Sequence, residues 1–130
     1  MSFPWPEVVE KALTHHSTPF YLSAWSPVEA AVFELSLLES TLPVKHWLSF
    51  KTHPIAPLVR SWRRTNRGIE VVSEFELRAA TSEGFHPQRI LVNGVGKHGW
   101  LQNHEFNDLW VNFDSLEEVE ALTRRPKPVP

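Results

Sequence analysis

The sequence contains no cysteine among its 130 residues. A disulfide framework, a thiolate metal site and a cysteine nucleophile are therefore all excluded. The sequence also lacks an apolar run of the roughly 18 residues that a membrane-spanning helix needs. Its first ten residues, MSFPWPEVVE, are acidic and interrupted by proline, whereas a signal peptide begins with a basic segment followed by an apolar one. We therefore expect a cytoplasmic protein with no membrane partner.

An excess of positive charge is absent as well. Thirteen lysine and arginine residues stand against 15 acidic ones, which gives a formal net charge of −2. Because nucleic-acid binding requires a basic patch, we expect no nucleic-acid partner. The seven histidines include no pair in an HExxH arrangement, so we also expect no metal site. The length suits one domain, but it is about half of the roughly 250 residues of a closed (β/α)8 barrel.

The first third of the sequence predicts two helices separated by a short strand. Residues 3–14 have the apolar spacing of an amphipathic helix. Residues 18–23 are typical of a strand, and the proline among them favours a sheet edge because it cannot donate a ladder hydrogen bond. Ser26 is expected to cap a second helix, with Glu29 as its capping-box partner. This helix should end before Pro43.

After residue 44, short apolar segments alternate with helical ones. The expected strands begin near residues 46, 69, 90 and 109. Strands that alternate with helices at this spacing predict βαβ units and a parallel sheet. Serines at 73 and 115, each followed three residues later by glutamate, indicate capping boxes for two of the helices. Gly68 is expected to end the helix over 55–65, and Gly84 the helix that Ser73 begins.

Lys51 is the first candidate for chemistry, because it ends the first of these strands. Parallel α/β folds build their sites at the carboxyl ends of strands. A partly desolvated lysine there can form a Schiff base with an aldehyde cofactor. The alternative interpretation is a solvated lysine at a strand end. Glu70, on the next strand, either approaches and holds the Lys51 ammonium or is only an edge carboxylate.

Two further polar residues follow strands on the same side of the expected sheet. Ser73 is an N-cap, whatever else it contacts, and Asn93 ends the third strand, where it can reach a ligand. The loop from Asn93 to Gly99 does not match a phosphate-binding P-loop. Leu91 stands where that motif has glycine, and His98 where it has serine or threonine. A glycine-containing turn is the better prediction.

Several segments resemble, in the correct order, the N-terminal part of the fold-type III pyridoxal-phosphate (PLP) decarboxylases. This group includes the diaminopimelate, ornithine and arginine decarboxylases. The resemblance extends over nearly the whole chain after residue 17. The segments that carry it are TPFY (18–21), LSFKTH (48–53), EVVSEFEL (70–77), GFHPQRI (84–90), VNGVGK (92–97) and VNFDS (111–115).

The resemblance implies an α/β fold that is a partial (β/α)8 TIM barrel, about the first four βα units, preceded by a strand that belongs to a β-domain. Residues 1–43 would hold the N-terminal helix, this strand and a lead-in helix. Residues 44–125 would form the first half of an alanine-racemase-like PLP barrel, and 126–130 a proline-rich tail. Within the barrel, Lys51 matches the lysine that forms the internal aldimine with PLP. The cofactor-binding residues would be Lys51, Glu70, Ser73 and Asn93.

The implied function is that of an N-terminal fragment of a PLP-dependent amino-acid decarboxylase. The sequence departs from the family at His53, where Asn is usual, and at Glu70, where many members have Asp. The family's phosphate-binding loop lies in later barrel strands, so we expect weak PLP binding and little turnover by this chain alone. The complete enzyme would take an amino-acid substrate, and the chain would form a homodimer or pair with a fuller subunit.

Three alternatives remain open. The first is a non-catalytic regulatory or interaction module derived from this family, because a half barrel has two open sheet edges that need a partner. A single-domain PLP-binding barrel protein is a second alternative, although the strand predicted over 18–22 argues against it. A generic α/β domain without a cofactor is the third.

Overall fold

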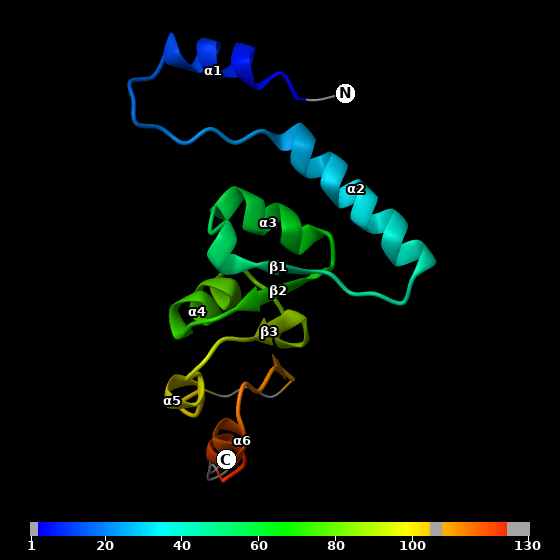
Figure 1. Cartoon of the computed structure of the whole chain (residues 1–130), viewed down its shortest axis with the longest axis vertical. Coiled ribbons are helices and arrows are strands. Elements are labelled where there is room, and N and C mark those ends of the chain that lie inside the picture. The colour runs from blue at the N-terminus through cyan, green and yellow to red at the C-terminus, as the bar shows by residue number, and fades with distance from the viewer. Residues whose placement is uncertain (1–2, 105–107, 125–130) are drawn as a thin grey trace. The chain divides into compact units, whose positions relative to one another are not determined.

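A computed structural model describes residues 3–104 and 108–124 of the chain (Figure 1). The chain divides into two compact units, Met1–Val44 and Lys45–Pro130. The first unit is helical, and the second contains a parallel sheet with its connecting helices. None of the helices in the described ranges is long and apolar enough to cross a membrane.

The first unit contains helices α1 (Trp5–Leu13) and α2 (Trp25–Thr41). Both were predicted, and α2 ends before Pro43 as expected. The predicted capping box at Ser26 is wrong, because the N-cap of α2 lies two residues earlier, at Ala24, and no side-chain hydrogen bond forms there. Proline is tolerated in the first turn of a helix, because the N–H that it lacks is not used there. The proline after Ser26 therefore does not fix the residue at which α2 begins.

The strand expected over residues 18–23 is not formed in this chain. Residues 16–24 belong to neither a helix nor a strand. A strand requires backbone hydrogen bonds to a neighbouring strand, and the only sheet within the described ranges lies in the second unit. This segment therefore does not form a strand here, although its residue types favour one. Its assignment to a β-domain stays a prediction.

The second unit is built on four parallel strands in the order β1-β2-β3-β4. The strands are β1 (Trp47–Ser49), β2 (Gly68–Val71), β3 (Ile90–Val92) and β4 (Trp110–Val111). The connections are η1 (Phe50–Thr52), α3 (Ala56–Arg64), α4 (Glu74–Ser82), η2 (Pro87–Arg89) and α5 (His98–Leu101), and α6 (Leu116–Thr123) follows β4. The predicted α/β class and parallel sheet are confirmed.

The two faces of this sheet differ in composition. Ile69 pairs in register with Ile90, and both are almost fully buried, at 0% and 1% exposure. Ser49, Glu70 and Leu91 lie in one register row and are only half-buried. Because side chains alternate between faces along a strand, one face forms the apolar core and the other carries the polar residues.

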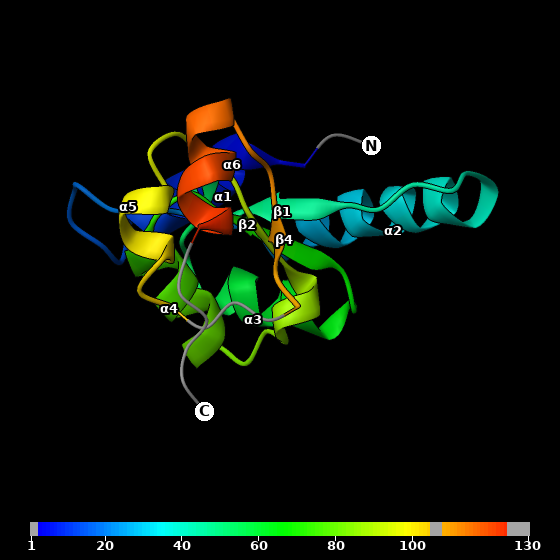
Figure 2. The same cartoon turned by 90° about the horizontal axis from the view of Figure 1, so that it is seen from below.

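Helices α3 and α4 lie on one side of the sheet (Figure 2). Their buried residues are Val59 and Trp62 in α3, and Leu77 and Ala80 in α4. The Trp62 indole N–H donates to the Gly68 carbonyl at 2.6 Å, which connects α3 to the start of β2. The core thus forms between these helices and the apolar face of the sheet.

Gly68 has a different role from the predicted one. Helix α3 ends at Arg64, and Asn66 adopts the left-handed conformation with φ of 63°. Asparagine tolerates that region better than most residues. Gly68 instead begins β2 opposite Trp47, where an added Cβ would lie 2.1 Å from a carbon of the indole ring. Close packing, and not chain reversal, therefore requires glycine at this position.

The predicted starts of α4 and α6 and the predicted end of α4 are confirmed, whereas α6 ends at Thr123 and not at Arg125, which lies outside the described residues. The Ser73 hydroxyl accepts a hydrogen bond from the Glu76 backbone N–H at 3.3 Å, and Ser115 accepts one from Glu118 at 3.2 Å. Gly84, with φ of 83°, follows the C-terminus of α4. At these three positions the local capping signals agree with the helix ends that form.

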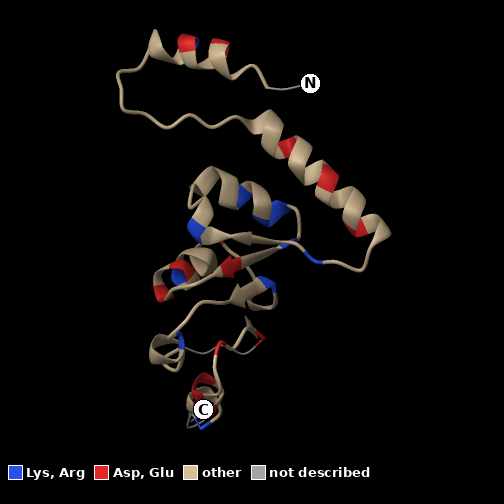
Figure 3. Cartoon of the chain, viewed as in Figure 1, with Lys and Arg blue, Asp and Glu red and all other residues tan. Residues whose placement is uncertain are grey.

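Charged residues on neighbouring helices of the second unit pair with each other. All charged residues of α3 are basic, whereas α4 carries both signs (Figure 3). The Arg60 guanidinium donates to both oxygens of Glu83 at 2.8 and 3.0 Å, which joins α3 to the end of α4. The hydrogen bond from Arg60 is the main reason that the pKa of Glu83 is lowered.

Candidate functional site

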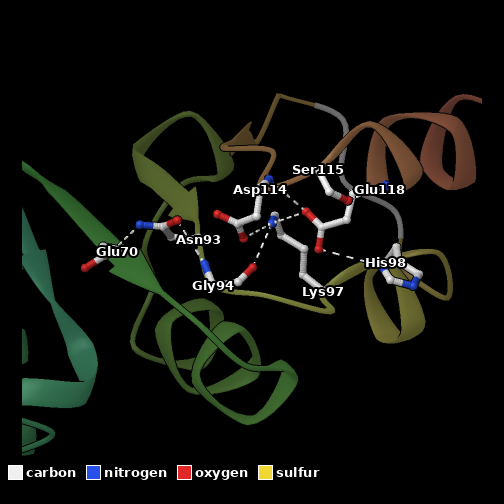
Figure 4. Close-up of polar contacts among 8 residues, drawn as sticks. All are labelled: Glu70, Asn93, Gly94, Lys97, His98, Asp114, Ser115 and Glu118. Atoms are coloured by element: carbon white, nitrogen blue, oxygen red, sulfur yellow. Dashed lines mark hydrogen bonds and ion pairs between the residues drawn. The ribbon is translucent and has the colours of Figure 1, made fainter.

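The polar residues predicted from the sequence gather at the carboxyl ends of the strands. Lys51 lies in η1, directly after β1, and its side chain is exposed. Glu70 lies in β2, and Asn93 directly follows β3. The structure brings the last two into contact, because the Asn93 amide nitrogen donates to the Glu70 carboxylate at 2.7 Å (Figure 4). We call the group Ser49, Lys51, Glu70 and Asn93 the rim.

The pKa of Glu70 is lowered, so its carboxylate is ionised at neutral pH. Hydrogen bonding with the Ser49 hydroxyl is the main cause, burial opposes it, and the Asn93 bond and the positive charge of Lys51 add to the lowering. Ser49 is the register partner of Glu70 in β1. Its buried hydroxyl meets no partner in full hydrogen-bond geometry, so we regard this contact as weak. The rim therefore holds a fixed negative charge near a lysine.

Ser73 has a structural role in this chain. Its hydroxyl accepts from Glu76 and caps α4. The Glu76 carboxylate in turn accepts from the Val72 backbone N–H at 2.7 Å, which fixes the turn between β2 and α4. The proposal that Ser73 also lines the cofactor site stays a prediction.

A second cluster of charged residues was not identified from the sequence. Lys97 is fully buried, and its ammonium donates to the Gly94 carbonyl at 2.7 Å, to Asp114 at 2.9 Å and to Glu118 at 2.5 Å (Figure 4). Glu118 is 3% exposed. The capping box predicted only a local contact for Glu118. Such a pattern does not reveal Lys97 as its partner, because Lys97 lies 21 residues earlier in the chain.

Burial and pairing compete in this cluster. Burial acts to lower the pKa of Lys97, but hydrogen bonds and charge attraction from Asp114 and Glu118 outweigh it and raise the pKa. Burial likewise acts to raise the pKa of Glu118, while bonds from Lys97 and the Asp114 backbone N–H lower it to about 2. The cluster therefore contains one cation between carboxylates. The His98 Nδ1 atom lies 3.6 Å from the second oxygen of Glu118.

The rim fits the aldehyde end of a PLP molecule. Lys51 offers an accessible amine, Glu70 a nearby anion, and Ser49 a buried hydroxyl whose oxygen has no partner in full hydrogen-bond geometry. Lys97 does not offer a site for the phosphate group of PLP, because its ammonium is buried and already donates to three acceptors. Among residues 3–104 and 108–124, no group of three histidine or acidic side chains is placed to hold a metal ion.

These features define an α/β protein with a lysine–carboxylate site at the carboxyl ends of a parallel sheet. No family model matches the chain. Curated relatives do, and they are diaminopimelate decarboxylases. The enzyme of Zymomonas mobilis is 29% identical over 124 residues, covering 92% of this chain and 28% of the enzyme. That of Helicobacter pylori is 27% identical over 117 residues, covering 87% of this chain and 28% of the enzyme.

A third diaminopimelate decarboxylase, from Bacteroides thetaiotaomicron, is 36% identical over 62 residues, which cover 46% of this chain and 16% of the enzyme. The chain is therefore homologous to diaminopimelate decarboxylases, and its resemblance to the fold-type III PLP decarboxylases is confirmed. It spans little more than a quarter of the length of the first two relatives.

Proposed function

We propose that this chain is the N-terminal part of a PLP-dependent amino-acid decarboxylase and that Lys51 is its PLP-binding lysine. The observation that carries the proposal is the position of Lys51 in η1, directly after β1, near enough to the ionised Glu70 on β2 for its charge to lower the pKa of that carboxyl group. The homology to diaminopimelate decarboxylases supports it. Residues 44–125 would then form the first half of a (β/α)8 barrel, with residues 1–43 preceding it and 126–130 as a tail.

Three of the rim residues, Lys51, Glu70 and Asn93, have distinct tasks in this proposal. PLP, when bound, supplies an electron sink for loss of the substrate carboxyl group. Lys51 must lose its proton to react with an aldehyde, and the exposure of its side chain leaves the amine accessible to the cofactor. Glu70 attracts the lysine side chain to the rim by charge, and Asn93 orients the carboxylate through their 2.7 Å hydrogen bond.

The remaining parts of the site would come from outside this chain. We infer that further barrel strands supply the PLP phosphate site and that an amino acid is the substrate. A homodimer, or a pair with a fuller subunit, would complete the enzyme in the cytoplasm. The half-buried polar face of the sheet supports this inference, because the interior of a complete barrel is filled by side chains from all of its strands.

Borohydride trapping tests the proposal. The chain is incubated with PLP, reduced with borohydride, digested and mapped by mass spectrometry. We expect the label on Lys51, its loss in Lys51→Ala, and its retention in Lys45→Ala, which removes another exposed lysine of the same unit. An unlabelled Lys51 in a folded chain, or labelling equal to that of Lys45, would overturn the assignment.

A non-catalytic interaction module is the second candidate. Trp110 in β4 is 53% exposed, and β1 and β4 each pair with one neighbour in the described sheet. An exposed aromatic side chain on an edge strand favours a protein partner. Coexpression with a full-length decarboxylase, followed by co-purification of wild type and Trp110→Ser, tests this role. Association that is independent of Trp110, or no association, would count against it.

A further inference from the structure

Gly94, in the loop after β3, is held through both of the peptide groups that flank its Cα. Its N–H donates to the Asn93 side-chain oxygen at 2.9 Å, and its carbonyl accepts from the Lys97 ammonium at 2.7 Å. Gly94 has φ of 87°, a region that favours glycine. Two hydrogen bonds, one on each flanking peptide group, therefore hold Gly94 in a backbone conformation that glycine adopts readily.

Asn93 connects Gly94 to the rim. Its backbone N–H donates to the Val71 carbonyl at 2.9 Å, which continues the pairing of β2 with β3. Its side-chain oxygen accepts from Gly94, and its side-chain nitrogen donates to Glu70. An amide bound at both ends has one orientation only, so the donor that faces Glu70 depends on the acceptor remaining on Gly94 (Figure 4).

Lys97 is a rigid anchor for this arrangement. Its side chain is fully buried, and two of its three acceptors, Asp114 and Glu118, lie at the turn that begins α6. Glu118 itself is fixed by its second contact, with the Asp114 backbone N–H at 3.1 Å. The ammonium thus joins the loop after β3 to the loop after β4 without contacting the rim directly.

We propose that Lys97 is a positioning residue for the rim: by holding the Gly94 carbonyl, it keeps the Asn93 amide on the Glu70 carboxylate. The proposal rests on the function assigned above to Lys51 and Glu70. Without the ammonium, the Gly94 carbonyl loses its donor, and φ and ψ of Gly94 are free to change. The Gly94 N–H, on the other side of the same Cα, then leaves the Asn93 oxygen, and the Asn93 amide is free to turn away from Glu70.

The test measures the pKa of Glu70 by carbon-detected NMR titration, which requires no cofactor. The variant Lys97→Met with Glu118→Leu removes both charges of the buried pair and so avoids leaving an unpaired buried charge. We expect the pKa of Glu70 to rise by about half to one unit, because a hydrogen bond to the charged form is lost. Asn93→Ala should give a similar rise. Lys45→Met, which removes an exposed cation, is the matched control and should leave the value unchanged.

The decisive comparison adds the Lys97/Glu118 pair of substitutions to Asn93→Ala. If Lys97 acts through Asn93, the pKa of Glu70 does not change further. An unchanged pKa of Glu70 in the folded Lys97/Glu118 variant would overturn the proposal. An equal rise in the Asn93→Ala background would also overturn it, because the effect would then be a direct effect of charge and not one that acts through Asn93. Borohydride trapping at Lys51 in the same samples is read separately. An unlabelled Lys51 with the expected titration rejects the PLP assignment and leaves the coupling intact.

Discussion

Removal of the Glu118 charge should lower stability strongly at neutral pH and hardly at all in acid. The carboxylate is 3% exposed, and the pKa of Glu118 is lowered from 4.5 to about 2 by the Lys97 ammonium and the Asp114 N–H against the opposing effect of burial. A shift of this size corresponds to about 3 kcal/mol of folding free energy. That is a large fraction of the roughly 5–15 kcal/mol by which a domain is stable.

The sign of the pH dependence follows from the direction of the shift. A carboxyl group with a depressed pKa in the folded state contributes its full stabilisation above its unfolded pKa, near 4.5, and loses it as the pH falls toward about 2. The wild type and Glu118→Gln should therefore differ by about 3 kcal/mol at pH 7 and converge between pH 4.5 and 2. Other carboxyl groups with lowered pKa values titrate in both proteins, so their effects cancel in this difference.

Urea denaturation followed by tryptophan fluorescence, repeated at several pH values, measures this difference. Glu120→Gln is the matched control, because Glu120 lies on the same helix in an exposed i,i+4 pair with Arg124. This control should stay close to the wild type at every pH, since exposed pairs contribute little. A difference for Glu118→Gln that is equally large at pH 7 and pH 3 would refute the reasoning, since the loss would then come from packing and not from charge.

Substitutions at three further positions test the fold. Gly68→Ala should destabilise the second unit by about 1–3 kcal/mol, because the new methyl group overlaps the Trp47 ring. The expected result is a lower midpoint in urea denaturation, and an unchanged midpoint would contradict the close packing. Ser73→Ala should cost about 1 kcal/mol by removing the acceptor for the Glu76 N–H, and Ser73→Asp, which restores a capping acceptor, should recover most of it in thermal unfolding. Ile69→Ala should cost about 2–5 kcal/mol, since the side chain is 0% exposed; a cost below 1 kcal/mol would place it outside the core.

The sequence predicts those parts of the fold that depend on local signals. Capping serines and the alternation of strands with helices are local, and they correctly predicted the α4 and α6 starts and the parallel order of the sheet. Local preference failed where tertiary structure decides. Residues 18–23 have strand character but pair with no strand in the described chain, and Gly68 is required by the Trp47 ring and not by a helix end.

The candidate site was predictable only as a set of neighbouring strand ends. Glu70 and Asn93 were both placed at this edge, but their hydrogen bond depends on register and side-chain orientation. Lys97 was not identified because a lysine in a glycine-containing loop is ordinarily solvated. Its burial depends on Asp114 and Glu118, which are 17 and 21 residues further along the chain, and no short pattern encodes contacts at that separation.

The contact between Trp47 and Gly68 also limits how the second unit can misassemble. A slip of one residue between β1 and β2 would move every side chain of β2 to the opposite face, so that Glu70 would face the helices and Ile69 the rim. Such a slip would also bring Arg67 or Ile69, each with a Cβ, to the place opposite Trp47 where the present pairing has a glycine. The indole ring therefore disfavours a slip of one residue between β1 and β2. The same steric contact that favours this alignment also keeps Glu70 on the face of the sheet where Asn93 reaches it.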